Sequence, residues 1–394
     1  MTVISAVHTH RVSLPLRFPF VTALRRTEHV DTLLVQVVDS DGRSGWGEAP
    51  QVWQVTGESV IGAQACVEQM LGPILVGEPL GEWPRLADRL GLVVARNGGA
   101  KSAVQTALLD LVCRADGIPL VELLCGTRRG EAASSEGRGP ESGVEPAASG
   151  VAVWSATDVT LSAADLAATV RSAVERVGDG FTTLKLKVGT DPAGDVARVI
   201  AVRQEVGDAI DLRLDANQGW SRDAAVRAMR ALEQAGVGVE FVEQPVAGED
   251  VEGLAWVRQR VDTPVVADEA VFAMTDLDRV VRLQAADGIN VKLVKAGGPL
   301  PALAQARVAQ QAGLATMVGS MMESDVGVAA ALHVAVAGRA SLVGDLDAGW
   351  WLRRPVPMSG LYYGTDGTVR IEPGLGLGVV PSLTACPAPG QVRG

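Results

Sequence analysis

The second half of the chain alternates short apolar runs with stretches of helical periodicity. Eight runs each have the length and composition of a buried strand: VAVWSAT, TTLKLKV, DLRLDAN, VEFVEQP, TPVVADE, GINVKLV, LATMVGS and SLVGDLD. The repeated strand–helix order predicts an α/β fold, a modified (β/α)8 barrel of the TIM type over residues 151–357. An open doubly wound sheet is the alternative, but the glycine-rich phosphate loop typical of that fold is missing after the early strands.

The flanking regions have other patterns. Residues 1–128 begin with strand patterns, including a hairpin turn at Asp39–Gly42, and continue with a helix that ends at Gly117, so they predict an α+β capping domain. Residues 129–150 are rich in Gly, Ser, Glu, Ala and Pro without an apolar period, and we expect a flexible loop. Residues 358–394 are glycine-rich, and we expect them to pack back on the capping domain.

Composition restricts the classes of partner. The net charge of −11 without a basic run disfavours nucleic acid. No apolar run approaches the roughly 20 residues of a membrane span, and the N-terminus lacks a signal-peptide core. The four cysteines have no metal-type spacing, which favours free thiols in a reducing, cytoplasmic compartment. A homo-oligomer is also expected.

Charged residues stand where successive barrel strands end. Lys187, Asp215, Glu243, Asp268 and Lys292 follow one another at intervals of 24 to 28 residues, about one strand–helix unit each. Because active sites of such barrels lie at the C-terminal ends of the strands, these charges should form one ring at one rim.

The three consecutive carboxylates predict a metal site. Asp215, Glu243 and Asp268 would repel one another strongly without a cation, and oxygen-only ligands favour Mg²⁺, with Mn²⁺ as a substitute ion. The alternative is that each carboxylate caps the following helix, which is common for a single aspartate after a strand.

The lysines predict acid–base chemistry. Lys187 and Lys292 should face each other across the metal, so one can remove a proton next to a carboxylate while the other returns one from the opposite face. The metal would stabilise the resulting enediolate. Lys185 shares a face with Lys187 and, as a like charge, should lower the pKa of Lys187 or bind an anionic group directly. Solvated rim lysines are the alternative.

These residues lie in motifs that resemble a known family. TLKLKVG, LRLDANQGW, VEQPV, VADEAVF and INVKLVKAGG, together with GWGEAP in the N-terminal region, resemble the muconate-lactonizing subgroup of the enolase superfamily over nearly the whole chain. The resemblance implies that Lys187 and Lys292 are the catalytic bases, and that Asp215, Glu243 and Asp268 bind the metal.

One subgroup of the family fits best. GDLDAGWWL places Asp345 and Asp347 at the eighth strand, which resembles dipeptide epimerases, where such a pair holds the free ammonium of the substrate. Arg25 stands where L-Ala-D/L-Glu epimerases use an arginine for the acidic side chain. The resemblance therefore implies a metal-dependent dipeptide epimerase with Lys185, Arg25, Asp345 and Asp347 as substrate-binding residues.

Other readings stay open. N-acylamino acid racemase, o-succinylbenzoate synthase and muconate cycloisomerase share the scaffold, but none of their substrates has a free ammonium. A catalytically silent binding protein on the same fold should have lost a lysine or a ligand. Trp350 and Trp351 depart from the small or aliphatic residues expected after the aspartate pair. They either pack in the barrel or stack on a bulky or cationic substrate side chain.

Overall fold

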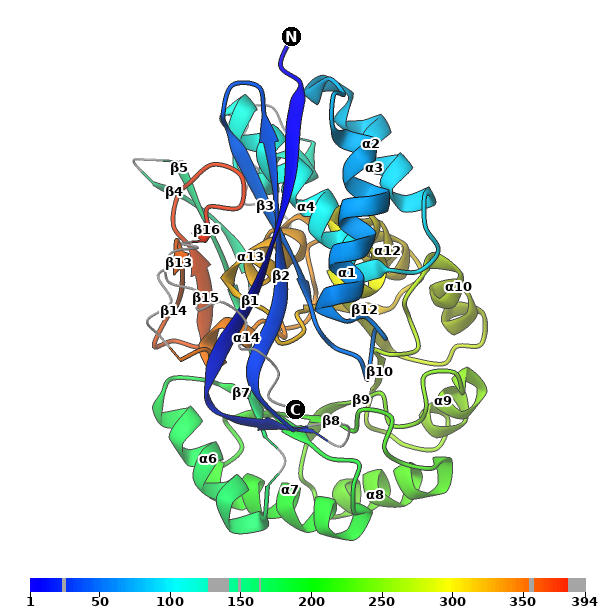
Figure 1. The fold of residues 1–394 in the computed structure, drawn as a ribbon. Helices are drawn as coiled ribbons and strands as arrows, with labels where there is room; N and C mark the ends of the chain where they lie inside the picture. The colour runs from blue at the N-terminus through cyan, green and yellow to red at the C-terminus, as the bar shows by residue number, and fades with distance from the viewer. Residues whose placement is uncertain (23–25, 127–141, 148–149, 163, 354–357, 382–394) are drawn as a thin grey trace, which may run out of the picture.

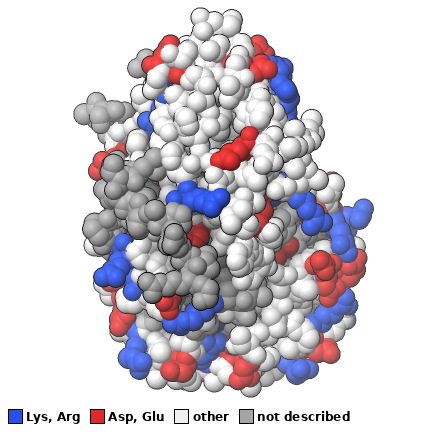
Figure 2. All heavy atoms as spheres, in the orientation of Figure 1, with Lys and Arg blue, Asp and Glu red and all other residues white. Residues whose placement is uncertain are grey.

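The computed structural model describes residues 1–22, 26–126, 142–147, 150–162, 164–353 and 358–381. The first body is the N-terminal antiparallel sheet with its helices, and the second is the barrel below it in Figure 1. None of the described helices is long and apolar enough to cross a membrane. On the face shown in Figure 2, the described acidic and basic side chains are interspersed, and neither sign forms a continuous band.

The N-terminal sheet has the strand order β1-β2-β3. Its strands are β1 (Ile4–Val21), β2 (Arg26–Asp39) and β3 (Ser44–Pro50). The helices are α1 (Val60–Cys66), α2 (Gly72–Leu75), α3 (Trp83–Leu92), α4 (Gly98–Asp116) and α5 (Leu120–Cys125), with a π-helical turn at Val67–Leu71 and a 3-10 turn at Leu80–Glu82. The long β1–β2 hairpin reaches from this body down over the barrel (Figure 1). The predicted hairpin turn and the helix end at Gly117, which has φ of 73°, are confirmed.

The second body is a parallel sheet of seven strands in sequential order, surrounded by helices. The strands are β6 (Val159–Leu161), β7 (Thr183–Lys187), β8 (Asp211–Asp215), β9 (Val239–Glu243), β10 (Val265–Ala267), β11 (Gly288–Lys292) and β12 (Ala315–Gly319). The helices are α6 (Leu166–Gly178), α7 (Pro192–Val206), α8 (Arg222–Gln234), α9 (Val251–Arg258), α10 (Met274–Arg282), α11 (Leu293–Ala296), α12 (Pro299–Gln311), α13 (Asp325–Ala337) and α14 (Ala348–Trp351).

The eighth position of the barrel is filled by a segment that is not a full strand. Parallel bridges join Gly319 to Asp345 on one side and Thr157 to Gly344 on the other. The segment therefore lies between β12 and the start of β6 and closes the ring. The predicted (β/α)8-type barrel is confirmed, with the correction that the SLVGDLD run contributes bridges instead of a strand.

The first predicted barrel strand was wrong. The VAVWSAT run forms most of β5 (Gly150–Ala156), which lies in a separate sheet of order β14-β15-β5-β4, and β6 is the first barrel strand. The other members are β4 (Ser142–Ala147), β14 (Leu361–Tyr363) and β15 (Thr368–Ile371), and β13 (Met358–Ser359) pairs with β16 (Val380–Pro381). An apolar run predicts a strand, but its pattern does not say which sheet the strand joins.

The range 129–150, expected to be a flexible loop, contains β4 in its described part. Strand β4 pairs antiparallel with β5 from Ser142 opposite Ser155 to Ala147 opposite Gly150. It is an edge strand, where a proline such as Pro146 is tolerated because one side of the backbone needs no partner. Backbone pairing with β5 therefore makes a strand from a sequence with no strand pattern.

The C-terminal segment contacts the N-terminal body through a buried carboxylate. Asp110 on α4 accepts hydrogen bonds from the backbone N–H groups of Trp46 and Leu377, each at 2.8 Å. The backbone N–H of Leu120 donates to the carbonyl of Gly376 at 2.8 Å. These bonds join β3, α4 and the tail. The exact domain boundaries at residues 128, 150 and 357 stay predictions.

Helix α4 packs directly on β3 because two glycines leave room for its backbone. A Cβ atom at Gly47 would lie 2.0 Å from the carbonyl oxygen of Ala103, and one at Gly45 would lie 2.2 Å from that of Ala107. Real Cβ contacts are never this short, so either substitution would separate the sheet from the helix.

We expect Gly47→Ala to lower the free energy of unfolding by about 2 kcal/mol or more, because the overpacked helix must move. Gly91→Ala is the matched control, since Gly91 lies in α3 with open space around its Cα, and helix propensity should stabilise it by roughly 0.5–1 kcal/mol. Urea unfolding followed by circular dichroism measures both. Equal stability of the two variants would contradict the close helix–sheet contact.

Candidate active site

The barrel mouth gathers the charged residues that end successive strands. Lys187, Asp215 and Glu243 are neighbours in register on β7, β8 and β9, so their side chains leave the sheet at one level. Asp268 follows β10, and Lys292 ends β11. The side chains of all five are buried, as is that of Lys185. The predicted ring is thus assembled by the strand order alone.

Each lysine of the ring lies against a carboxylate. Lys187 Nζ is 2.6 Å from Asp215 Oδ2, and Lys292 Nζ is 2.8 Å from Asp268 Oδ2. Strands β7 and β11 are four positions apart in an eight-position ring, so the two ammonium groups approach the centre from opposite sides. This is the placement that proton transfer at two faces of one carbon requires.

Lys185 contacts two carboxylates of the site, and its predicted substrate-binding role stays a prediction. Its Nζ lies 2.7 Å from Asp345 Oδ2 and 3.5 Å from Glu243 Oε2, deep beneath the ring. Burial alone would lower the pKa of Lys185, but these carboxylates raise it well above its usual value. Lys185 is therefore a fixed positive charge that compensates the carboxylates. It also lines the pocket, where an anionic substrate group can reach it.

Burial and crowding shift the carboxylates in opposite directions. Burial raises the pKa of Glu243, and the charges of Asp215 and Asp268 add to it, although Lys185 opposes the shift. The pKa of Asp268 is lowered despite burial, because Lys292 and Lys295 both lie on its side chain. Lys295 Nζ is 2.6 Å from Asp268 Oδ1. The lysines of the site therefore do not fully compensate the negative charge of its buried carboxylates.

Helix capping does not explain the three carboxylates. Helices α8, α9 and α10 begin after Ser221, Asp250 and Ala273, which occupy the cap positions instead. Asp215, Glu243 and Asp268 therefore point into the barrel mouth for another reason.

The donor set fits a hard divalent cation. Besides the three carboxylates, Glu269 Oε2 and Asn217 Oδ1 are buried at this rim without a hydrogen-bond partner. Among the described residues, no three acidic, histidine or cysteine side chains are already gathered around one point. Lysines lie against the carboxylates instead. A bound cation would satisfy the unpaired oxygens and replace ammonium contacts on the aspartates.

The pocket at the mouth is shared by both bodies. Its empty space, counted together with the solvent at its opening, is about 580 Å³. The N-terminal body contributes Phe20 and Thr22 at the tip of the β1–β2 hairpin, and Val52, Gln54 and Val55 from the loop after β3. The hairpin therefore closes the site from above.

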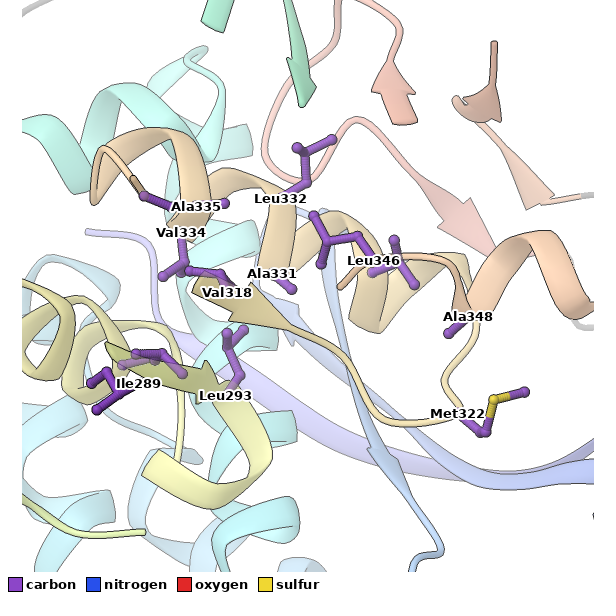
Figure 3. Close-up of a cluster of buried hydrophobic side chains, with 14 of the residues drawn as sticks. Ile289, Leu293, Val318, Met322, Ala331, Leu332, Val334, Ala335, Leu346 and Ala348 are labelled. Atoms are coloured by element: carbon purple, nitrogen blue, oxygen red, sulfur yellow. The ribbon is translucent and has the colours of Figure 1, made fainter. Parts of the chain in front are cut away.

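Asp345 and Asp347 both line this pocket. Leu346 between them is fully buried and points among core side chains such as Val318 and Leu332 (Figure 3). Burial of that leucine, favourable by roughly 1.5–3 kcal/mol, keeps the two flanking carboxylates turned toward the pocket. Asp347 is at the N-cap position of α14 but makes no side-chain cap bond, so capping of that helix does not explain why an aspartate stands there.

Arg25 lies outside the described residues, so its predicted contact with a substrate side chain stays a prediction. Trp350 and Trp351 are 8% and 4% exposed and are absent from the pocket lining. They pack against each other and against Phe20 and Phe181. The packing alternative is thus confirmed, because both rings are buried and neither lines the pocket.

Sequence reasoning missed four residues of the site. Glu269, Asn217 and Thr160 line the pocket, and Lys295 holds Asp268. The first two stand one or two positions after proposed metal ligands, which was a usable signal. Thr160 acts through its backbone N–H, which no side-chain pattern reveals.

Two family models together span most of the chain. The one described as "Enolase C-terminal domain-like" matches residues 165–385. The one described as "Mandelate racemase / muconate lactonizing enzyme, N-terminal domain" matches residues 4–125. The chain belongs to the mandelate racemase/muconate lactonizing enzyme family of the enolase superfamily. The resemblance inferred from the motifs is confirmed.

Two curated relatives of this chain are dipeptide epimerases. The L-Ala-D/L-Glu epimerase of Bacillus subtilis is 36% identical over 94% of this chain and 95% of its own. The hydrophobic dipeptide epimerase of Enterococcus faecalis is 33% identical over 95% of this chain and 99% of its own. These relatives are isomerases, and so is this member of the family.

Solved structures of two relatives superpose closely on this enzyme. The substrate-liganded B. subtilis L-Ala-D/L-Glu epimerase has a TM-score of 0.86 at 35% identity, covering 96% of this chain and 99% of its own. The E. faecalis dipeptide epimerase complexed with Mg and L-Leu-L-Tyr has a TM-score of 0.84 at 33% identity, with the same coverage of 96% and 99%. The barrel and capping arrangement is thus that of the family.

We expect the enzyme to bind Mg²⁺ without substrate, and Glu243→Gln to weaken this binding at least about tenfold, because a ligand charge is lost. Asp250→Asn is the matched control, since Asp250 follows the same strand but caps α9 near the surface. Isothermal titration calorimetry measures both affinities. Unchanged affinity in Glu243→Gln would contradict the assigned metal site.

Proposed function

We propose that this enzyme is a Mg²⁺-dependent dipeptide epimerase that inverts the α-carbon of the C-terminal residue of its substrate. One observation carries the proposal: two opposed lysines and the Asp345–Asp347 pair line the same pocket. The lysines can remove and return a proton at one carbon. The aspartates can bind a positively charged group several bonds away from that carbon. A free dipeptide has both features in one small molecule.

The lysines would exchange the proton. Lys187 and Lys292 approach from opposite sides, so one ammonium nitrogen, once neutral, takes the α-proton from its face and the other delivers a proton to the opposite face. Reaction in the reverse direction exchanges the two roles. This accounts for conversion in both directions without any reorientation of the substrate.

Asp215, Glu243 and Asp268 would hold the cation. When bound, Mg²⁺ supplies positive charge to the substrate carboxylate, whose negative charge grows as the α-proton leaves. Lysine bases with Mg²⁺ are the solution used in enolase-superfamily sites. Lys185 would remain on Asp345 and Glu243, and so keep the carboxylate cluster from repelling the substrate.

The aspartates of the eighth segment would hold the N-terminal ammonium. Asp345 is compensated by Lys185, and burial raises the pKa of Asp347, with Asp345 adding to the effect. A cationic group at Asp347 would relieve this crowding. A charge-assisted hydrogen bond of this kind contributes roughly 1.5–3 kcal/mol.

The second candidate is an N-acylamino acid racemase on the same scaffold. The N-succinyl-L-Arg/Lys racemase of Bacillus cereus is 31% identical over 84% of this chain. Its acylated substrates carry no free α-ammonium, so they would leave the aspartate pair without the partner proposed here, and their only cationic group is the Arg or Lys side chain. Muconate cycloisomerase and o-succinylbenzoate synthase chemistry meet the same objection.

The cytoplasmic location and the homo-oligomeric state stay predictions. Cys66 and Cys113 are buried free thiols, which supports a reducing compartment.

We expect the wild-type enzyme to exchange the α-hydrogen of a free dipeptide in D₂O with kcat/KM at least about a hundredfold above that of the N-acetyl dipeptide, since acetylation leaves Asp347 unpaired. Asp347→Asn should lower this ratio, because it should reduce kcat/KM more for the free dipeptide than for the N-acetyl dipeptide. Asp41→Asn, at an exposed turn, is the control that keeps the ratio. Proton NMR across a dipeptide library measures both substrate forms with each of the three enzymes. Equal kcat/KM for free and acetylated forms would move the function to the acylamino acid racemase.

A further inference from the structure

The side chain of Asp347 is oriented by two donors on one of its oxygens. Asp347 Oδ2 accepts hydrogen bonds from Trp351 Nε1 at 2.9 Å and from the backbone N–H of Thr160 at 2.7 Å. An aspartate with one oxygen held by two fixed N–H groups cannot rotate about its terminal torsion without breaking both bonds. These two hydrogen bonds therefore fix the orientation of the carboxylate that lines the pocket.

The indole that donates this bond is itself immobilised. The ring of Trp351 meets Phe20 edge-on at 5.2 Å between centroids and Trp350 at 5.6 Å. Trp350 is in turn covered by Phe181 at 5.8 Å and by the guanidinium of Arg176 at 4.6 Å. Aromatic pairs in such edge-to-face geometry are favourable beyond their buried area, so the stack resists rotation of the indole.

The stack is tied to the capping hairpin. Phe20 belongs to β1 and also lines the pocket. Next to the stack, the backbone N–H of Arg353 donates to the carbonyl of Pro15 at 2.8 Å, and Arg17 Nε donates to the carbonyl of Leu352 at 3.1 Å. The hairpin strand and the end of α14 are thus held together at the level of Trp351.

We propose that Trp351 is a positioning residue that orients the Asp347 carboxylate toward the substrate ammonium. Through its contact with Phe20, Trp351 also couples this orientation to the packing of strand β1 on the barrel. This rests on the proposed dipeptide function. Space filling alone does not distinguish the two tryptophans. Only Trp351 donates a hydrogen bond to an aspartate of the pocket. Trp351 does not line the pocket, so its effect passes through Asp347.

Trp351→Phe removes the N–H donor and keeps an aromatic ring in the stack. We expect the KM of the free dipeptide to rise about tenfold or more while kcat changes less than about threefold, because the lysines and metal ligands are untouched. The preference for the free over the N-acetyl dipeptide should fall by a similar factor. Trp350→Phe, in the same stack but without a bond to Asp347, should retain the wild-type preference within about twofold.

A double-mutant cycle separates positioning from general loss of structure. If Trp351 acts through Asp347, adding Trp351→Phe to Asp347→Asn should change the free-dipeptide kcat/KM less than about twofold further. Additive losses in the cycle, or an equal effect of Trp350→Phe, would mean that the residue only fills space and would overturn the proposal. Thermal unfolding of each variant identifies a folding defect, which would appear in kcat for both substrate forms.

The outcomes distinguish this proposal from the function on which it rests. If the wild-type enzyme prefers the acetylated form, the dipeptide function fails and the role of Trp351 fails with it. If the wild-type enzyme prefers the free dipeptide and Trp351→Phe retains that preference, only the role of Trp351 is wrong.

Discussion

The site depends on one constraint: carboxylates and lysines buried together at the barrel mouth must compensate one another. An isolated buried charge is strongly unfavourable, so the cluster is stable only as a set. Lys185 balances Asp345 and Glu243 from below, Lys187 and Lys292 lie on Asp215 and Asp268, and Lys295 adds a second charge to Asp268. A divalent cation fits this set because it would neutralise the carboxylates in place of Lys187 and Lys292. The two lysines would then be free to contact the substrate. The same constraint makes the fold selective, since a strand displaced in register would leave several charges unpaired.

The second element is the shared boundary between the two bodies. The β1–β2 hairpin places Phe20 and Thr22 over the pocket, and the eighth barrel segment places Asp345 and Asp347 beneath them. Phe20 and Trp351 join these parts physically. Substrate selection therefore combines a barrel that carries the proton chemistry with a cap that shapes the remaining volume.

Sequence patterns predicted the ring of charges well, for a physical reason. Parallel strands of similar length bring their C-terminal ends to one rim, so the spacing between Lys187 and Lys292 determined their common location. The identity of the first and eighth barrel elements was not predictable in this way. The run at β5 pairs with the distant β15, and the eighth segment closes the ring through isolated bridges. The compensating role of Lys185 on Asp345 was also missed, since the two residues are 160 positions apart and only the closed barrel brings them to 2.7 Å.

In the proposed mechanism, Lys187 and Lys292 each serve one face of the same carbon. The most direct measurement follows deuterium uptake at that carbon by proton NMR in D₂O, starting from each diastereomer of one dipeptide, with Lys187→Ala and Lys292→Ala. We expect neither variant to interconvert the diastereomers. Residual exchange should survive from one diastereomer in the first variant and from the other diastereomer in the second. Interconversion at the normal rate in either variant, or exchange of the same diastereomer in both, would contradict this mechanism.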